Sequence, residues 1–143
     1  MLISTKGRYA LRVMIDLAEH NSGEYIPLKE IADRQNISKK YLESIIALLV
    51  KENFLDGLRG KGGGYRLVKE PEKYSVRSIL LLTEGTLAPV SCLTEESHSC
   101  ERAYECRTLP MWTKLNSLIN DYLDSVSIAD LSRSSELQND YSI

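Results

Sequence analysis

The sequence lacks any long hydrophobic run. No segment of its 143 residues approaches the roughly 18 consecutive apolar residues of a membrane-spanning helix. Near the start, Asp16 interrupts a short apolar stretch, a pattern that argues against both a secretory signal and membrane insertion. We therefore expect a cytoplasmic protein of about one domain with no membrane partner.

Cysteine and histidine are scarce as well. Three cysteines, in a chain for which we expect no export, argue against a disulfide framework and favour reduced thiols that bind metal or react. The two histidines, His20 and His98, lie far apart in the sequence, and no nucleophile motif surrounds either of them. We therefore expect that the protein is not an enzyme.

Acidic residues slightly outnumber basic ones, but the excess lies in one half of the chain. Residues 1–69 carry 12 Lys and Arg against 8 Asp and Glu, a net charge of +4, whereas residues 70–143 carry a net charge of −6. Binding of a polyanion requires local positive charge rather than a basic protein overall. The first half is therefore the predicted nucleic-acid-binding half.

Helical spacing of apolar residues predicts a first helix over about residues 5–20, with two apolar edges that indicate contact with the core and with a partner subunit. A short second helix follows Pro27, and Ser38 caps a third helix that runs to about Glu52. Two helices joined by a tight turn, over about residues 28–51, form the arrangement whose second helix enters the DNA major groove. The alternative is an ordinary helical hairpin in a small domain.

The third helix is predicted to turn a polar face outward at its N-terminal end. The residues expected to reach DNA from this face are Ser38, Lys39, Lys40, Tyr41, Glu43 and Ser44. Lysine and serine mainly contact phosphates and hold the protein in register. Glu43 repels a polyanion unless it accepts a hydrogen bond from a cytosine amino group, so we expect it to restrict which sequences bind.

A glycine-rich segment follows and predicts a β-hairpin wing over about residues 54–68, with strands at 54–59 and 65–68. Arg59 and Lys61 at its tip are expected to contact DNA, Arg59 in the minor groove. A nucleotide-binding loop is the alternative, but the segment lacks the GK[ST] ending of such loops. Lys6 and Arg8, at the start of the first helix, are further candidates for phosphate contact.

The second half of the chain is predicted to contain a capped fourth helix, a cysteine loop over about residues 86–110 and a long helix over about residues 111–126. A loop of that length in a compact domain usually has its own function. The long helix can cross a dimer interface. Residues 132–143 form a polar tail.

Four segments together resemble the Rrf2 family of bacterial winged helix-turn-helix regulators. They are ISTKGRYALRVMIDLA, ISKKYLESIIALL, LRGKGGGYRL and LDSVSIADL, and the match spans about residues 2–131 as one unit. The resemblance implies a mainly α fold with a small β-hairpin wing, that is, a winged helix-turn-helix domain plus a long dimerisation helix. It also implies a homodimer that binds double-stranded promoter DNA.

The three cysteines are spaced C-x7-C-x5-C, so their thiolates can converge on one metal centre. The loop resembles the iron-sulfur cluster regulator (IscR-like) branch of the family, which implies a [2Fe-2S] cluster on Cys92, Cys100 and Cys106. That branch has a histidine three residues after its last cysteine, whereas this chain has Leu109 there. His98 is then a candidate fourth ligand, beside a carboxylate, a serine or a residue of the other subunit. Zinc and metal-free redox thiols are the alternatives.

Two control mechanisms follow from these observations. In the first, binding to promoter DNA depends on the state of a cluster in the cysteine loop. In the second, a regulator of the same fold is controlled by a protein partner or by thiol redox chemistry without a cluster.

Overall fold

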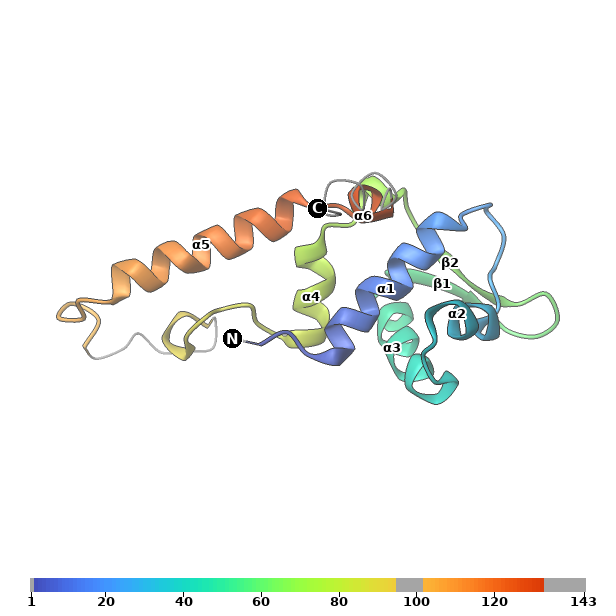
Figure 1. The fold of residues 1–143 in the computed structure, drawn as a ribbon, viewed down its shortest axis with the longest axis horizontal. Coiled ribbons are helices and arrows are strands. Elements are labelled where there is room, and N and C mark those ends of the chain that lie inside the picture. The colour runs from blue at the N-terminus through green and yellow to red at the C-terminus, as the bar shows by residue number, and fades with distance from the viewer. Residues whose placement is uncertain (1, 95–101, 133–143) are drawn as a thin grey trace, which may run out of the picture.

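The computed structural model describes residues 2–94 and 102–132 (Figure 1). It confirms the predicted fold class, because it is mainly helical with one two-stranded antiparallel sheet. The elements in chain order are α1 (Thr5–Glu19), α2 (Leu28–Gln35), α3 (Lys39–Lys51), β1 (Leu55–Leu58), β2 (Gly64–Leu67), η1 (Pro71–Lys73), α4 (Val76–Glu84), η2 (Ser91–Leu93), α5 (Leu109–Ser125) and α6 (Ile128–Ser132).

The main core forms where α1 packs against α2, α3, the hairpin and α6. Helix α1 contributes an apolar stripe to it because residues three and four apart share one helix face. The fully buried side chains of this stripe are Ala10, Val13, Met14 and Leu17. Helix α3 contributes the predicted stripe of Leu42, Ile45, Ile46 and Leu49, all buried. The polar face of α3 is therefore turned away from the core.

The wing is hydrogen-bonded to the segment that connects α1 and α2. Strands β1 and β2 pair with Leu55 opposite Leu67 and Leu58 opposite Gly64. Ile26 and Tyr65 exchange two backbone hydrogen bonds, each of 2.9 Å, so the segment before α2 lies beside β2 like a short third strand. Gly64 permits this approach, since a Cβ there would lie 2.2 Å from the Ile26 carbonyl oxygen.

Helices α4 and α5 form a second, smaller core away from the wing. Val76, Leu80 and Leu87 are buried in it, and Ile119 and Leu123 of α5 pack on them. Helix α5 extends away from the winged helix-turn-helix, so its N-terminal end lies at the opposite end of the molecule from the wing (Figure 1). No helix in residues 2–94 and 102–132 is long and apolar enough to cross a membrane.

The predicted boundaries of the cysteine loop and the long helix need one correction. Helix α5 begins at Leu109 rather than at Met111, and Pro110 lies inside its first turn. Proline is tolerated there because a first-turn N–H has no helical partner. The short helix η2 also lies within the stretch that we expected to be irregular.

Candidate nucleic-acid interface

The turn between α2 and α3 is sharp and well capped. Asn36 ends α2 in the left-handed conformation, with φ 52° and ψ 48°, which asparagine tolerates better than most residues. Ser38 then caps α3, because its hydroxyl accepts a hydrogen bond of 3.2 Å from the Tyr41 N–H. The side chains that follow this cap on the exposed face are Lys39, Lys40, Glu43 and Ser44.

Tyr41 differs from its neighbours on α3. It is half-buried and meets the ring of Tyr9 on α1 edge to face, with the ring centroids 5.7 Å apart. Its ring is therefore partly held by α1, and only the remainder is exposed. Ser44 donates a hydrogen bond of 2.8 Å to the Tyr41 carbonyl, so its hydroxyl is engaged on its own helix.

The wing tip carries two exposed cations, Arg59 and Lys61. Gly60 and Gly62 on either side of Lys61 have φ values of 90° and 77°, which non-glycine residues rarely adopt. Nearer the base of the wing, the Arg66 guanidinium donates to Asp56 at 3.2 Å and covers the Tyr25 ring at 4.2 Å. The charges at the tip are thus displayed on a hairpin that is fixed at its base.

The start of α1 presents one exposed and one half-buried cation. Arg8 is exposed, and its guanidinium donates a hydrogen bond of 3.2 Å to the Thr5 hydroxyl. Lys6 is half-buried, and its charge acts on Glu84 at the end of α4. Arg8 is therefore better placed than Lys6 to meet a phosphate.

The sequence analysis missed a polar network on α1. Asp16 is only 1% exposed, and the Arg34 guanidinium donates two hydrogen bonds to its carboxylate. This bond to Asp16, against the opposing effect of burial, raises the pKa of Arg34. The signal in the sequence was that Asp16 lies three residues after Val13, on the buried face of the helix, where a carboxylate needs a partner, but the periodicity did not name that partner.

The cysteine segment connects α4 to α5, and two of its three thiols lie among the described residues. Cys92 lies in η2 and Cys106 shortly before α5, and both are half-buried. The Cys106 sulfur lies 3.4 Å from the Thr108 hydroxyl oxygen. Hydrogen bonding from the Thr108 side chain, and then from backbone N–H groups, lowers the pKa of Cys106 below its usual value. Cys100 and His98 lie outside the described residues.

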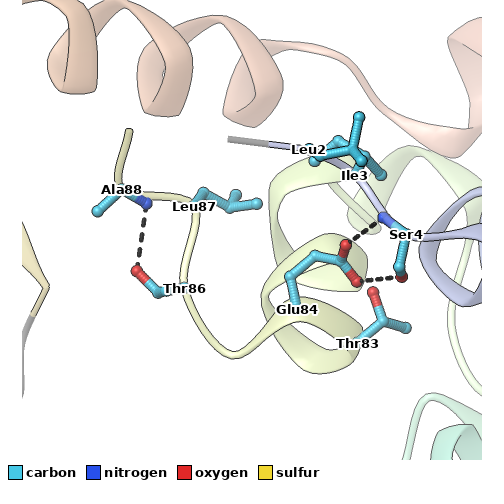
Figure 2. Close-up of a pocket in the computed structure, with 8 residues that line it drawn as sticks. All are labelled: Leu2, Ile3, Ser4, Thr83, Glu84, Thr86, Leu87 and Ala88. Carbon is cyan, nitrogen blue, oxygen red and sulfur yellow. Dashed lines mark hydrogen bonds between the residues drawn. The ribbon is translucent and has the colours of Figure 1, made fainter. Parts of the chain in front are cut away.

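Residues 2–94 and 102–132 contain no group of three or more His, Cys, Asp or Glu side chains that could hold a metal ion. A cluster bound to these cysteines would therefore require at least one ligand beyond the described residues. A pocket of about 280 Å³ lies between the first residues of the chain and the end of α4, where the cysteine segment begins (Figure 2).

A helix-turn-helix followed by a hairpin with a basic tip defines a winged helix-turn-helix DNA-binding protein. Residues 3–134 match the family model described as "Rrf2: Iron-dependent Transcriptional regulator". The chain belongs to the Rrf2 family of transcriptional regulators. It is a regulator of transcription and not an enzyme.

Known relatives cover nearly the whole chain. The HTH-type transcriptional regulator IscR of Aliivibrio salmonicida is 34% identical over 96% of this chain and 81% of its own length. Protein rrf2 of Nitratidesulfovibrio vulgaris is 35% identical over 96% of this chain and 91% of its own. Among solved structures, CymR, the global cysteine regulator of B. subtilis, superposes with a TM-score of 0.76 at 32% identity, over 94% of this chain and 98% of its own. IscR of T. potens superposes with a TM-score of 0.72 at 33% identity, over 94% of this chain and 88% of its own.

Proposed function

We propose that this regulator binds promoter DNA in a way that depends on a [2Fe-2S] cluster held by Cys92, Cys100 and Cys106. The observation that carries the proposal is the set of three thiols, spaced C-x7-C-x5-C, in the one segment between α4 and α5. Soft thiolates suit iron-sulfur clusters. When bound, such a cluster would supply a centre that can be oxidised, reduced or lost.

Two features of the described thiols support this assignment. A thiol must lose its proton to bind a metal, and the lowered pKa of Cys106 favours that loss. Both Cys92 and Cys106 are half-buried, so the protein already removes them in part from water. His98, in the same segment, is our first candidate for the fourth ligand, beside a carboxylate, a serine or a residue of a second subunit.

The proposed DNA contacts come from three places. The first turns of α3 contribute Ser38, Lys39, Lys40, Tyr41, Glu43 and Ser44, the wing contributes Arg59 and Lys61, and the start of α1 contributes Lys6 and Arg8. The exposed cations among them supply the attraction to phosphate that anchors a protein on DNA. One recognition helix covers one half-site, so a dimer on a near-palindromic duplex is the proposed binding unit.

The proposed dimer contact is an apolar stripe on α5 that nothing covers within the described part of the chain. Its residues follow one another at helical spacing, with exposed fractions of 53%, 38%, 54% and 66% for Met111, Leu115, Leu118 and Tyr122. Contiguous apolar stripes of this kind usually mark an interaction site in a protein that is not a membrane protein. A second copy of the chain, with the same stripe on its α5, is the occupant that we propose.

The cluster is tested by purifying the protein without oxygen and measuring visible absorbance, iron and sulfide. Each of Cys92→Ala, Cys100→Ala and Cys106→Ala should lose iron while keeping helical circular dichroism, and each should change affinity for a duplex selected by the wild-type protein. Leu93→Ala, beside the first cysteine, removes a side chain that cannot bind metal; it is the matched control and should keep its iron. Retained iron in all three cysteine variants would overturn the ligand assignment, and loss of helicity in all three would make the metal structural rather than regulatory.

A second candidate is a regulator of the same fold that has no cluster and is controlled by a protein partner or by thiol redox chemistry. It is favoured by the lowered pKa of Cys106 and by the similarity to CymR of Staphylococcus aureus, solved in an oxidized form at 33% identity with a TM-score of 0.70. In this case the anaerobic protein is colourless, and peroxide followed by a dithiol changes its DNA affinity reversibly. Cys106→Ser should abolish that response.

A further inference from the structure

Three side chains along one side of α1, those of Tyr9, Arg12 and Asp16, contact residues on either side of the turn between α2 and α3. We call these three residues the polar stripe of α1. Its deepest member is Asp16, the only charged residue that is buried among residues 2–94 and 102–132. Its carboxylate accepts bonds from Arg34 at 2.8 and 3.0 Å and from the Gln35 amide at 2.9 Å. These bonds fix the end of α2 against α1, because loss of Arg34 would leave a buried charge uncompensated and loss of the Gln35 amide would leave a carboxylate oxygen without that donor.

Arg12, one turn before Asp16, binds Gln35 a second time. Its Nε donates to the Gln35 side-chain oxygen at 3.1 Å, and its Nη2 donates to the Gln35 carbonyl. Gln35 is the last residue of α2, directly before the left-handed Asn36. The planar guanidinium makes both bonds at once, which a lysine ammonium cannot reproduce in the same geometry.

The stripe continues to the other side of the turn. The Arg12 guanidinium covers the Tyr9 ring, with its carbon 5.0 Å from the centroid. Tyr9 in turn packs edge on against Tyr41 in the first turn of α3, with an interplanar angle of 78°. Residues of α1 therefore contact the last residue of α2 and the first turn of α3 through one connected set of side chains.

We propose that Arg12 and Gln35 are positioning residues for DNA recognition, which set the orientation of α3 without contacting DNA themselves. The guanidinium of Arg12 contacts Gln35 and the Tyr9 ring within the protein, whereas Arg8 is exposed to solvent. Contacts to base edges need side chains held within about 0.5 Å and 10–20° of the productive geometry. Contacts to phosphate tolerate more, because they depend on charge rather than on direction. Loss of the contact between Arg12 and Gln35 should therefore weaken binding to specific DNA sequences and leave binding to non-specific DNA unchanged.

The test compares two duplexes of equal length, one selected by the wild-type protein from a random library and one unrelated to it. Gln35→Ala removes an uncharged side chain, and Arg12→Lys keeps the charge but not the paired bonds. Each should weaken binding to the selected duplex by about tenfold or more, with unchanged affinity for the unrelated duplex and an unchanged salt slope. The double variant should lose less than the sum of the two single losses, because either change alone already breaks the bond between the Arg12 and Gln35 side chains.

Arg8→Ala is the matched control on α1. It should weaken binding to both duplexes and reduce the salt slope by about one. If Arg12→Lys weakened binding to both duplexes equally, its effect would not be on sequence recognition, and the proposal would be wrong. Unchanged binding to both duplexes in both variants, or additive losses in the double variant, would overturn it as well. Two single variants, each with its melting temperature recorded, keep the test decisive if one of them does not fold.

This inference rests on the proposed role of α3 at the DNA, and Lys40→Ala separates the two. If Lys40→Ala weakens binding to every duplex while Arg12→Lys and Gln35→Ala change nothing, only the positioning role fails. If Lys40→Ala also changes nothing, α3 does not face DNA, and the proposed interface fails with it.

Discussion

Ser4 and Glu84 lie 80 residues apart in sequence and are joined by two hydrogen bonds. The Ser4 backbone N–H donates to one carboxylate oxygen at 2.6 Å, and the Ser4 hydroxyl donates to the other at 2.8 Å (Figure 2). The same hydroxyl oxygen caps α1 by accepting from the Gly7 N–H at 3.0 Å. The end of α4, where the cysteine segment begins, is therefore tied to the start of α1, where Arg8 is exposed.

The hydrogen bonds between Ser4 and Glu84 make part of the free energy of unfolding depend on pH. Burial raises the pKa of Glu84, but bonds from Ser4 and Thr83 and the charge of Lys6 outweigh it, so the pKa is lowered overall. A carboxyl whose folded pKa is lowered stabilises the fold above its unfolded pKa and loses that effect as pH falls through the folded value. We expect Glu84→Gln to reduce the free energy of unfolding by about 1 kcal/mol near neutral pH.

The measurement is chemical denaturation across a range of pH. The difference between wild type and Glu84→Gln should begin to shrink as the pH falls below the ordinary pKa of glutamate. It should be smallest below the lowered pKa of folded Glu84, where both side chains are uncharged. A difference that stayed constant at all pH values would show that the carboxylate charge has no part in the tie.

The sequence analysis predicted α1, α3 and α4 well because each has an apolar stripe and a serine that caps its N-terminus. Leu42, Ile45 and Leu49 are buried as their spacing indicates, and Ser38 caps α3 as expected. Local patterns of this kind depend only on neighbours within one or two turns. The helix-turn-helix and the wing could therefore be predicted without a structure.

The contacts that orient these elements could not be predicted in the same way. Asp16 pairs with Arg34, which lies 18 positions away in the sequence. Arg12 donates a hydrogen bond to Gln35, which lies 23 positions away. The approach of Gly64 to Ile26 likewise depends on how the hairpin lies against the segment before α2. Such contacts are set by tertiary geometry, and periodicity carries no information about them.

Lys40 and Glu43 on α3 carry opposite charges, and we expect them to have different effects on DNA binding. Both are exposed on the same helix. Lys40→Ala should weaken binding to all duplexes and lower the salt slope by about one, as for a phosphate contact. Glu43→Ala should leave non-specific affinity the same or higher and reduce discrimination between duplexes, because removing an acid removes a penalty against wrong bases. Binding to selected and unrelated duplexes at several salt concentrations measures both effects. Complete loss of binding in Glu43→Ala would instead make this residue structural.

Gly64 is expected to be a glycine of the wing that cannot accept a side chain without displacing backbone atoms. Gly64→Ala would bring a Cβ to 2.2 Å from the Ile26 carbonyl oxygen, so the two bonds between Ile26 and Tyr65 must break or shift. We expect a loss of more than about 2 kcal/mol in the free energy of unfolding. Gly62→Ala is the matched control, since its φ is also positive but nothing lies within 4 Å, and it should cost only about 1 kcal/mol of backbone strain. Equal losses in the two variants, measured by urea denaturation, would show that the contact with Ile26 does not matter.

The apolar stripe of α5 is expected to hold two copies of the chain together. Leu118 is 54% exposed in the middle of the stripe, whereas Ser117 beside it is exposed on a different side of the helix. Leu118→Lys should give a monomer, because it places a charge in an apolar contact where no partner is available. Ser117→Lys adds the same charge beside Asp121, four residues on, and should remain a dimer.

Sedimentation and light scattering at micromolar concentration measure the mass of each variant. Helical circular dichroism should be retained in both, because α5 packs on α4 through Ile119 and Leu123 rather than through this stripe. The Leu118→Lys monomer should bind the selected duplex far more weakly than wild type, since one recognition helix reaches only one half-site. If Leu118→Lys remained a dimer, the second copy would have to pack elsewhere, and the uncovered stripe would have to belong to a different partner.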